Sequence, residues 1–191
     1  MDILKNQEII ESYLSATNLP NIDKLLAWLN ATDFYTAPAS CKYHLSCDGG
    51  LAQHSLNVFN ALFDFAFHGI IDYETEPIAL AALLHDVCKI HMYEKCFKWR
   101  KNDNNEWEQY ETYTINERFA YGHGEKSVYL VEQFVKLPYD VAQAIRAHMG
   151  FSDTSFKGGD KLIPNIFAEN PLALYLSFAD QHATFITEKE S

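Results

Sequence analysis

The stretch Leu83-Leu84-His85-Asp86-Val87-Cys88-Lys89 places an imidazole beside a carboxylate near the end of an apolar helical segment. Burying such a pair is costly unless both groups are satisfied, and coordination of a metal ion satisfies both. A lone His-Asp pair is more often a hydrogen-bonded core pair, so the stretch needs companions elsewhere in the chain. Lys89 lies one helical turn beyond His85, on the same face, where it could meet a phosphate oxygen without competing for a metal.

Three histidines and one aspartate, each in a different segment of the chain, supply these companions. His54 lies on the apolar stripe of a predicted helix, and His123 lies in a glycine-flanked segment. His148 ends another predicted helix, and Asp180 lies in a mostly apolar one. Each of these residues alone has a structural explanation. His148, for example, could be a favourable cation at a helix C-terminus. Together they form an ordered series with one ligand type per helix, and this series indicates a metal site.

Helical periodicity dominates the rest of the chain and predicts an all-α fold in a single domain. The expected helices cover residues 6–16, 21–31, about 50–68, about 77–90, about 123–136, 138–149 and about 170–187. The segment between the last two is expected to be a loop. Aromatic and charged residues alternate over about residues 95–114 around a turn-rich centre, which predicts a small β-hairpin inserted between helices.

The ordered series resembles the HD-domain superfamily of metal-dependent phosphohydrolases in its two-metal form. The resemblance is carried by Gly49-Gly50-Leu51-Ala52-Gln53-His54, His85-Asp86-Val87-Cys88-Lys89, Gly122-His123-Gly124-Glu125-Lys126-Ser127, Ala144-Ile145-Arg146-Ala147-His148 and Asp180. It implies one HD-type domain over residues 1–191. Within it, a metal-binding helical bundle would cover about residues 43–185, after an N-terminal helical extension over residues 1–40. The hairpin and that extension lie outside the resemblance.

The resemblance also implies two divalent metal ions held between helices. Asp86 would bridge the ions, with His54, His85 and Asp180 completing one site and His123 and His148 completing the other. Simpler HD enzymes lack the two middle histidines and hold one metal. Imidazole and carboxylate ligands suit Fe, Mn, Co, Ni or Zn better than Mg or Ca, and the resemblance favours iron or manganese.

Such a site predicts hydrolysis of a phosphoester, because two close metal ions can activate water for in-line phosphoryl displacement. Two divalent ions carry four positive charges, and Asp86 and Asp180 return two negative ones, so the surplus suits a phosphate. Asp86 and Lys89 are the expected catalytic residues, with Lys89 holding the phosphate. The expected substrate is a nucleotide or a related small phosphorylated molecule.

Three further cations are candidate substrate contacts. Lys98 and Arg100 alternate with Phe97 and Trp99 in the predicted hairpin, where aromatic faces could stack bases while cations meet phosphates. The alternative is a solvated hairpin whose aromatic side chains pack on the bundle. Arg146 is the third candidate, and its alternative is an exposed helix arginine.

Bulk composition excludes several classes of partner. The net charge of -11 argues against duplex nucleic acid, whose binding depends on cationic contacts with phosphates. Apolar runs are too short for a membrane span, and the polar first residues do not form a secretory signal. A cytoplasmic location is therefore expected, and without an export signal the cysteines are expected to be reduced thiols. None of them forms a C-x-x-C pair, so neither a zinc ribbon nor a thioredoxin-like motif is indicated. The oligomeric state stays open.

Three other functions fit the same residues. The first is a di-iron oxygenase, since some HD-superfamily members use this ligand set to activate oxygen. The second is a nucleotide-binding regulatory module without turnover, against which the intact ligand series argues. The third is a nuclease acting on single-stranded RNA or DNA, which the acidic charge disfavours.

Overall fold

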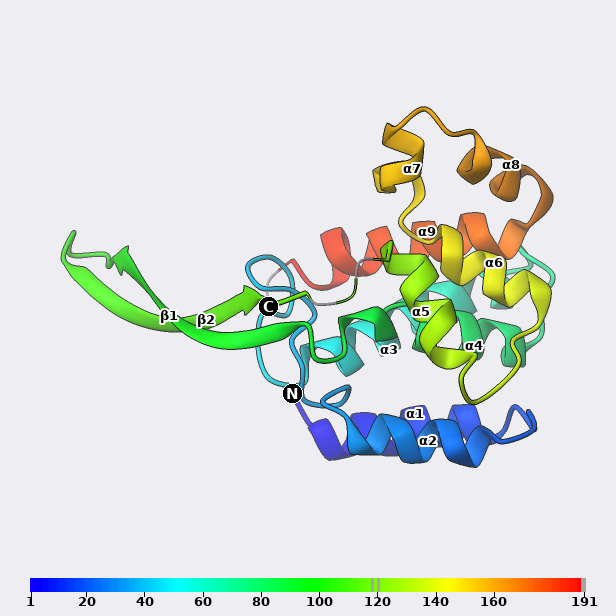
Figure 1. Ribbon diagram of the computed structural model, residues 1–191, viewed down its shortest axis with the longest axis horizontal. Coiled ribbons are helices and arrows are strands. Elements are labelled where there is room, and N and C mark those ends of the chain that lie inside the picture. The colour runs from blue at the N-terminus through cyan, green and yellow to red at the C-terminus, as the bar shows by residue number, and fades with distance from the viewer. Residues whose placement is uncertain (118, 120, 190–191) are drawn as a thin grey trace.

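The computed structural model describes residues 1–117, 119 and 121–189 of the chain. In this part, helices form the body of the molecule, and a two-stranded antiparallel sheet projects from one side of it (Figure 1). The α-helices are α1 (Ile3–Ser15), α2 (Ile22–Ala31), α3 (Gly50–Phe67), α4 (Thr75–Leu84), α5 (His123–Val131), α6 (Tyr139–Ala147), α7 (Thr154–Lys157), α8 (Leu162–Glu169) and α9 (Pro171–His182). The predicted all-α fold with an inserted hairpin is confirmed.

Helix α4 lies at the centre of the body, in contact with α3, α6 and α9. Every residue from Ile78 to Leu84 is buried, so the helix is apolar on all its faces. A helix of this composition is stable only when other elements surround it. Because His85 and Asp86 follow α4 directly, its burial carries both side chains into the interior.

The end of α4 differs from the helix predicted to continue to residue 90. The α-helix stops at Leu84, and His85 is its C-cap. Asp86 leaves the helical conformation with φ -110° and ψ 15°, and a 3-10 turn, η1 (Val87–Lys89), follows. The Asp86 side chain is buried at this break.

The segment between α6 and α9 also differs from the predicted loop, because it contains η2 (Gly150–Ser152), α7 and α8. Pro164 had argued for a loop, but it is the third residue of α8, as Pro77 is of α4. The first four N–H groups of a helix have no partner within it, so a proline there removes no hydrogen bond. Ile163 and Ile166 bury the inner face of α8 against the core.

Helices α1 and α2 run along one side of the bundle (Figure 1). Their residues Ile10, Leu14, Leu25 and Leu29 are fully buried. They belong to the same hydrophobic core as the apolar residues of α3, α4, α6 and α9. The N-terminal helices therefore share one core with the ligand-bearing helices.

The sheet consists of β1 (Tyr93–Lys101) and β2 (Trp107–Ile115), paired from Tyr93↔Ile115 to Lys101↔Trp107. It extends away from the helices, as Figure 1 shows. Phe97 and Trp99 are exposed, so the alternative in which these two rings pack on the bundle is wrong. Among the described residues, every helix is too short or too polar to span a lipid bilayer.

Candidate metal centre

His85 and His148 are oriented by the same local device at the ends of two helices. Each is the C-cap of its helix, α4 or α6, with closely similar φ and ψ angles. Each ring has its Nδ1 2.7 Å from the carbonyl oxygen three residues earlier, on Ala82 and Ile145 respectively. A carbonyl can only accept a hydrogen bond, so Nδ1 carries the proton and Nε2 presents its lone pair.

Asp86 lies between these two rings, and each ring faces a different oxygen of its carboxylate. Its Oδ1 is 3.6 Å from His148 Nε2, whereas its Oδ2 is 3.4 Å from His85 Nε2 and 3.6 Å from His54 Nε2. His54 reaches the cluster from the buried face of α3, and its Nε2 is also 3.2 Å from Asp180 Oδ1 on α9. Four helices thus bring five of the six predicted ligands together.

The donor atoms fit a metal ion. The Nε2 atoms of His54, His85 and His148 are buried, and none makes a hydrogen bond within the described part of the chain. Such unpaired nitrogens are costly to bury. Ligand atoms of one transition-metal ion lie about 3 Å apart when each is about 2.1 Å from the ion. Two groups of predicted ligands have ligand atoms that all lie within 4.8 Å of one another: His54, His85 and Asp86, and His85, His148 and Asp180. A third group that meets the same limit, His44, His54 and Glu188, includes two residues outside the predicted set.

His123 is the predicted ligand that stands apart. It is the first residue of α5, and its Nδ1 lies 3.3 Å from Cys88 Sγ. It lines the same pocket as Asp86 and His148. It belongs to none of these three groups among the described residues. Because Nδ1 faces Cys88, Nε2 is the nitrogen that a role for His123 in a second metal site would use.

Lys89 contacts the cluster directly, because its Nζ lies 2.6 Å from Asp86 Oδ2. Burial alone raises the pKa of Asp86, but Lys89 and the rings of His85 and His148 outweigh it and hold that pKa well below its usual value. Asp86 is therefore a carboxylate at neutral pH. Burial alone lowers the pKa of Lys89, but the negative charge of Asp86 raises that pKa above its usual value, so Lys89 stays protonated.

Glu188 is a residue of the site that the sequence did not reveal. The α9 helix continues into a π-helical turn, η3 (Ala183–Thr187), and Glu188 follows it. Its carboxylate is buried and lies 3.0 and 3.1 Å from His54 Nδ1, while Asn57 Nδ2 donates a 2.8 Å hydrogen bond to it. A carboxylate behind a ligating imidazole fixes its tautomer and orientation. No spacing pattern near residue 188 signals this contact, which joins residues 134 positions apart.

His44 is the second such residue, although its position before the first ligand helix was a hint. Its ring centroid lies 4.9 Å from that of His54. Burial, followed by the neighbouring His54 and Lys89, lowers the pKa of His44 to about 4. The ring is therefore neutral at neutral pH, and both its nitrogens are buried without a hydrogen-bond partner in the described structure.

The other predicted substrate contacts lie elsewhere. Lys98 and Arg100 are exposed on the projecting sheet and do not line the pocket, and Arg100 Nε pairs with Glu108 at 2.6 Å. Arg146 is held within the fold, with Nε 2.7 Å from Glu125 and Nη1 3.0 Å from Asp153. It connects α5, α6 and the turn before α7 instead of reaching the pocket. The structure thus corrects the expectation for all three cations.

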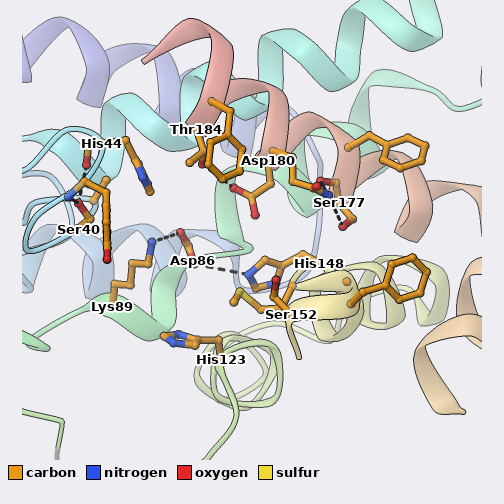
Figure 2. Close-up of a pocket in the computed structure, with 18 of the residues that line it drawn as sticks. Ser40, His44, Asp86, Lys89, His123, His148, Ser152, Ser177, Asp180 and Thr184 are labelled. Atoms are coloured by element: carbon orange, nitrogen blue, oxygen red, sulfur yellow. Dashed lines mark hydrogen bonds and ion pairs between the residues drawn. The ribbon is translucent and has the colours of Figure 1, made fainter. Parts of the chain in front are cut away.

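A pocket of about 560 Å³ opens over the cluster and is lined by Asp86, Lys89, His123, His148 and Asp180. Figure 2 shows Lys89 and His44 on one side of Asp86, with His148, Ser152 and Ser177 on the other. The pocket size suits a small molecule. A ligand could therefore reach the buried donor atoms.

The comparisons with known proteins agree with this arrangement. The HD domain family model matches residues 51–184, which is more than half of the chain. The matched range contains all six predicted ligands and ends before Glu188. A search of curated proteins found no match to this chain, and a search of solved structures found none either.

Proposed function

This chain belongs to the HD domain family, a family mostly of metal-dependent hydrolases, and from that premise we propose that it is a phosphohydrolase acting on a nucleotide or a related small phosphoester. The observation that carries the proposal is the set of buried Nε2 atoms without hydrogen bonds on His54, His85 and His148. All three face carboxylates beneath a pocket that also holds Lys89.

The residues suggest how the metals would be divided. His54, His85, Asp86 and Asp180 would hold one ion, and His123, His148 and Asp86 would hold the other. Asp86 suits a bridging role because its two oxygens face different imidazoles. The mixed imidazole and carboxylate donors favour iron or manganese over magnesium or calcium. When bound, such ions would supply Lewis-acid activation of water and neutralise charge on the phosphoryl group.

The chain's own groups prepare the site for this chemistry. The carbonyls of Ala82 and Ile145 keep a proton on Nδ1 of His85 and His148, so each Nε2 stays available as a ligand. Glu188 does the same for His54. Lys89 keeps a permanent positive charge at the pocket wall, where it would bind a phosphate oxygen and stabilise negative charge that develops there.

Metal content and phosphate release test this proposal. The protein, purified without chelator or nickel resin, is expected to carry about two equivalents of iron or manganese per chain. Asp86→Ala should lose the metal and all release of phosphate from phosphoesters. Asp86→Asn, which keeps the side-chain size, should do the same and covers the case in which the alanine variant misfolds. Asp64→Ala, at an exposed aspartate of α3, is the matched control and should behave as the parent.

Three results would contradict the proposal in different parts. About one equivalent of metal would remove His123 from the ligand set and leave a one-metal phosphohydrolase. Oxygen consumption without phosphate release would favour an oxygenase. If the protein binds no metal after reconstitution with either ion, the catalytic assignment is wrong and a binding module is the better account.

A further inference from the structure

The pocket over the metal ligands has two chemically different sides. Lys89 and His44 lie on one side of Asp86, and Ser152 and Ser177 lie on the other (Figure 2). Four phenylalanines of the described chain line the pocket, and three of them, Phe151, Phe167 and Phe178, belong to the segments that carry Ser152 and Ser177 or to the neighbouring helix α8, whereas Phe185 follows Thr184. We call the rings of Phe151, Phe167 and Phe178 the aromatic subsite.

The aromatic subsite is attached rigidly to the metal ligands. Phe151 lies in η2, three residues after His148, and Phe178 lies on α9, two residues before Asp180. The centroid of Phe151 is 5.9 Å from that of Phe167, and their planes are close to perpendicular. Phe151 is 60% exposed and Phe178 is 46% exposed. Large apolar rings left open inside a pocket are suited to covering an apolar surface of a ligand.

The opposite side carries little positive charge. Among the described residues that line the pocket, Lys89 is the one lysine or arginine. The protein as a whole carries a net charge of -11. Beyond the charge that bound metal ions would supply at one point, this field opposes the approach of a polyanion. The site therefore matches one phosphate group better than a chain of phosphates.

From these two sides we propose that the substrate is a phosphomonoester with a single phosphate, whose alcohol carries a planar ring that lies against the aromatic subsite. This inference rests on the proposed function. The phosphate would lie at the metal ligands and Lys89. Water would attack phosphorus, the bond from phosphorus to the alcohol oxygen would break, and a proton from the water would pass to that oxygen. The products are the free ring-bearing alcohol and inorganic phosphate.

Steady-state phosphate release by the full-length, metal-loaded protein tests the inference. The ring-bearing compounds are the four common nucleoside 5′-monophosphates and p-nitrophenyl phosphate. The ringless ones are ribose 5-phosphate and glycerol 3-phosphate, and adenosine triphosphate tests the phosphate number. We expect kcat/KM to be higher, on the order of tenfold, for the best ring-bearing compound than for ribose 5-phosphate, because stacking on an aromatic ring strengthens binding by about that factor.

Variants connect this preference to the aromatic subsite. Phe151→Ala and Phe178→Ala should each raise KM for the ring-bearing compound, on the order of tenfold, and leave KM for ribose 5-phosphate within about twofold. Both rings are partly exposed, so the core stays intact, and a thermal melt checks the fold. The matched control is Phe97→Ala, a ring on the projecting sheet that is about as exposed as Phe151, and it should change neither KM.

Equilibrium binding by calorimetry separates the inference from the function on which it rests. One outcome is that the protein binds adenosine monophosphate more tightly than ribose 5-phosphate, loses this preference in Phe151→Ala and releases no phosphate. This outcome would support the aromatic subsite and contradict the proposed hydrolase activity. Equal kcat/KM for ring-bearing and ringless compounds, with no effect of Phe151→Ala, overturns the aromatic subsite. Faster hydrolysis of the triphosphate than of the monophosphate overturns the single-phosphate assignment.

Discussion

At the scale of single residues, the three buried histidines of the centre are held in two different ways. His85 and His148 hydrogen-bond to carbonyls of their own helices, so their orientation is local. His54 is the fifth residue of α3, where the backbone carbonyls are already engaged in the helix. Its Nδ1 is held instead by Glu188, near the end of the chain. The orientation of His54 therefore depends on how the C-terminal segment packs.

This difference predicts that Glu188→Ala weakens metal binding by about 10- to 100-fold, as is usual when the partner of a ligating imidazole is removed. Glu188→Gln should recover part of the loss, because the amide oxygen can still accept from His54 Nδ1. Competition between the protein and a chelator of known affinity measures the effect. Glu132→Ala, at an exposed glutamate, serves as the control. Equal metal affinity in Glu188→Ala and the parent would show that His54 needs no such support.

At the scale of elements, the close contact between α5 and α6 positions His123 and His148. A Cβ atom built on Gly124 would lie 2.2 Å from the carbonyl oxygen of Arg146 and 2.7 Å from that of Ile145. Both are backbone atoms of α6. The glycine thus allows α5 to approach α6 closely, directly beside His123.

Gly124→Ala should therefore force the two helices apart and lower the free energy of unfolding by about 1–3 kcal/mol. Gly122→Ala is the matched comparison on the other side of His123, because its Cβ would meet only the side chain of Glu125, which can move. Its effect should stay below about 1 kcal/mol. Urea denaturation measures both. A Gly124→Ala protein as stable as the Gly122→Ala protein would contradict the tight helix contact.

Arg146 connects the same elements through Asp153, which also accepts a hydrogen bond from the Ser155 backbone at the start of α7. Burial raises the pKa of Asp153, but its hydrogen bonds with Ser155 and the charge of Arg146 outweigh burial and lower it. A carboxyl whose pKa is lower when folded stabilises the protein above its unfolded value of about 3.9, and this contribution is lost as the pH falls through the folded value.

Asp153→Asn is accordingly expected to cost about 1 kcal/mol or less at pH 7, given partial screening by solvent. The difference from the parent should shrink as the pH falls below about 4. Urea denaturation at pH 7 and at pH 3 measures it. A difference that stays constant across this range would show that the Asp153 charge does not stabilise the fold.

At the scale of the whole molecule, one hydrophobic core extends from Ile10 in α1 to Ala183 after α9. Four of the six candidate ligands, His54, His85, Asp86 and His148, are buried, and the six come from segments spread over residues 54–180. An ion bound to them would link α3, α4, α6 and α9 at one point. Metal binding should therefore stabilise the entire domain and not only the pocket.

Removal of the metal by a chelator is expected to lower the melting temperature of the protein. A ligand at 100 times its Kd stabilises a folded protein by about 2.7 kcal/mol, so the melting temperature should rise with free metal concentration. Melting curves over a series of manganese or iron concentrations measure the shift. Asp86→Asn should melt at a temperature independent of metal. The same melting temperature with and without metal in the parent would contradict a bound ion in the core.

Much of this architecture follows from residue patterns that act over short distances. The apolar periodicity of residues 50–68 and the continuous apolar run before His85 predict buried helices, because each helix must cover its apolar side chains. The alternation over residues 95–114 predicts the hairpin in the same way. The order of His54, His85-Asp86, His123, His148 and Asp180 indicated the family, which the match over residues 51–184 shows.

Contacts between distant segments depend on packing, and no local pattern encodes them. Glu188 reaches His54 only because a π-helical turn after α9 returns the chain to α3. Arg146 was expected to face a substrate, but the approach of α5 and α7 pairs it with Glu125 and Asp153. Lys98 and Arg100 carry the right charge for a phosphate, yet they do not line the pocket, because they lie on the sheet. That sheet projects from the helical body (Figure 1). Residue type sets what a side chain can bind, whereas the packing of whole elements sets which group it meets.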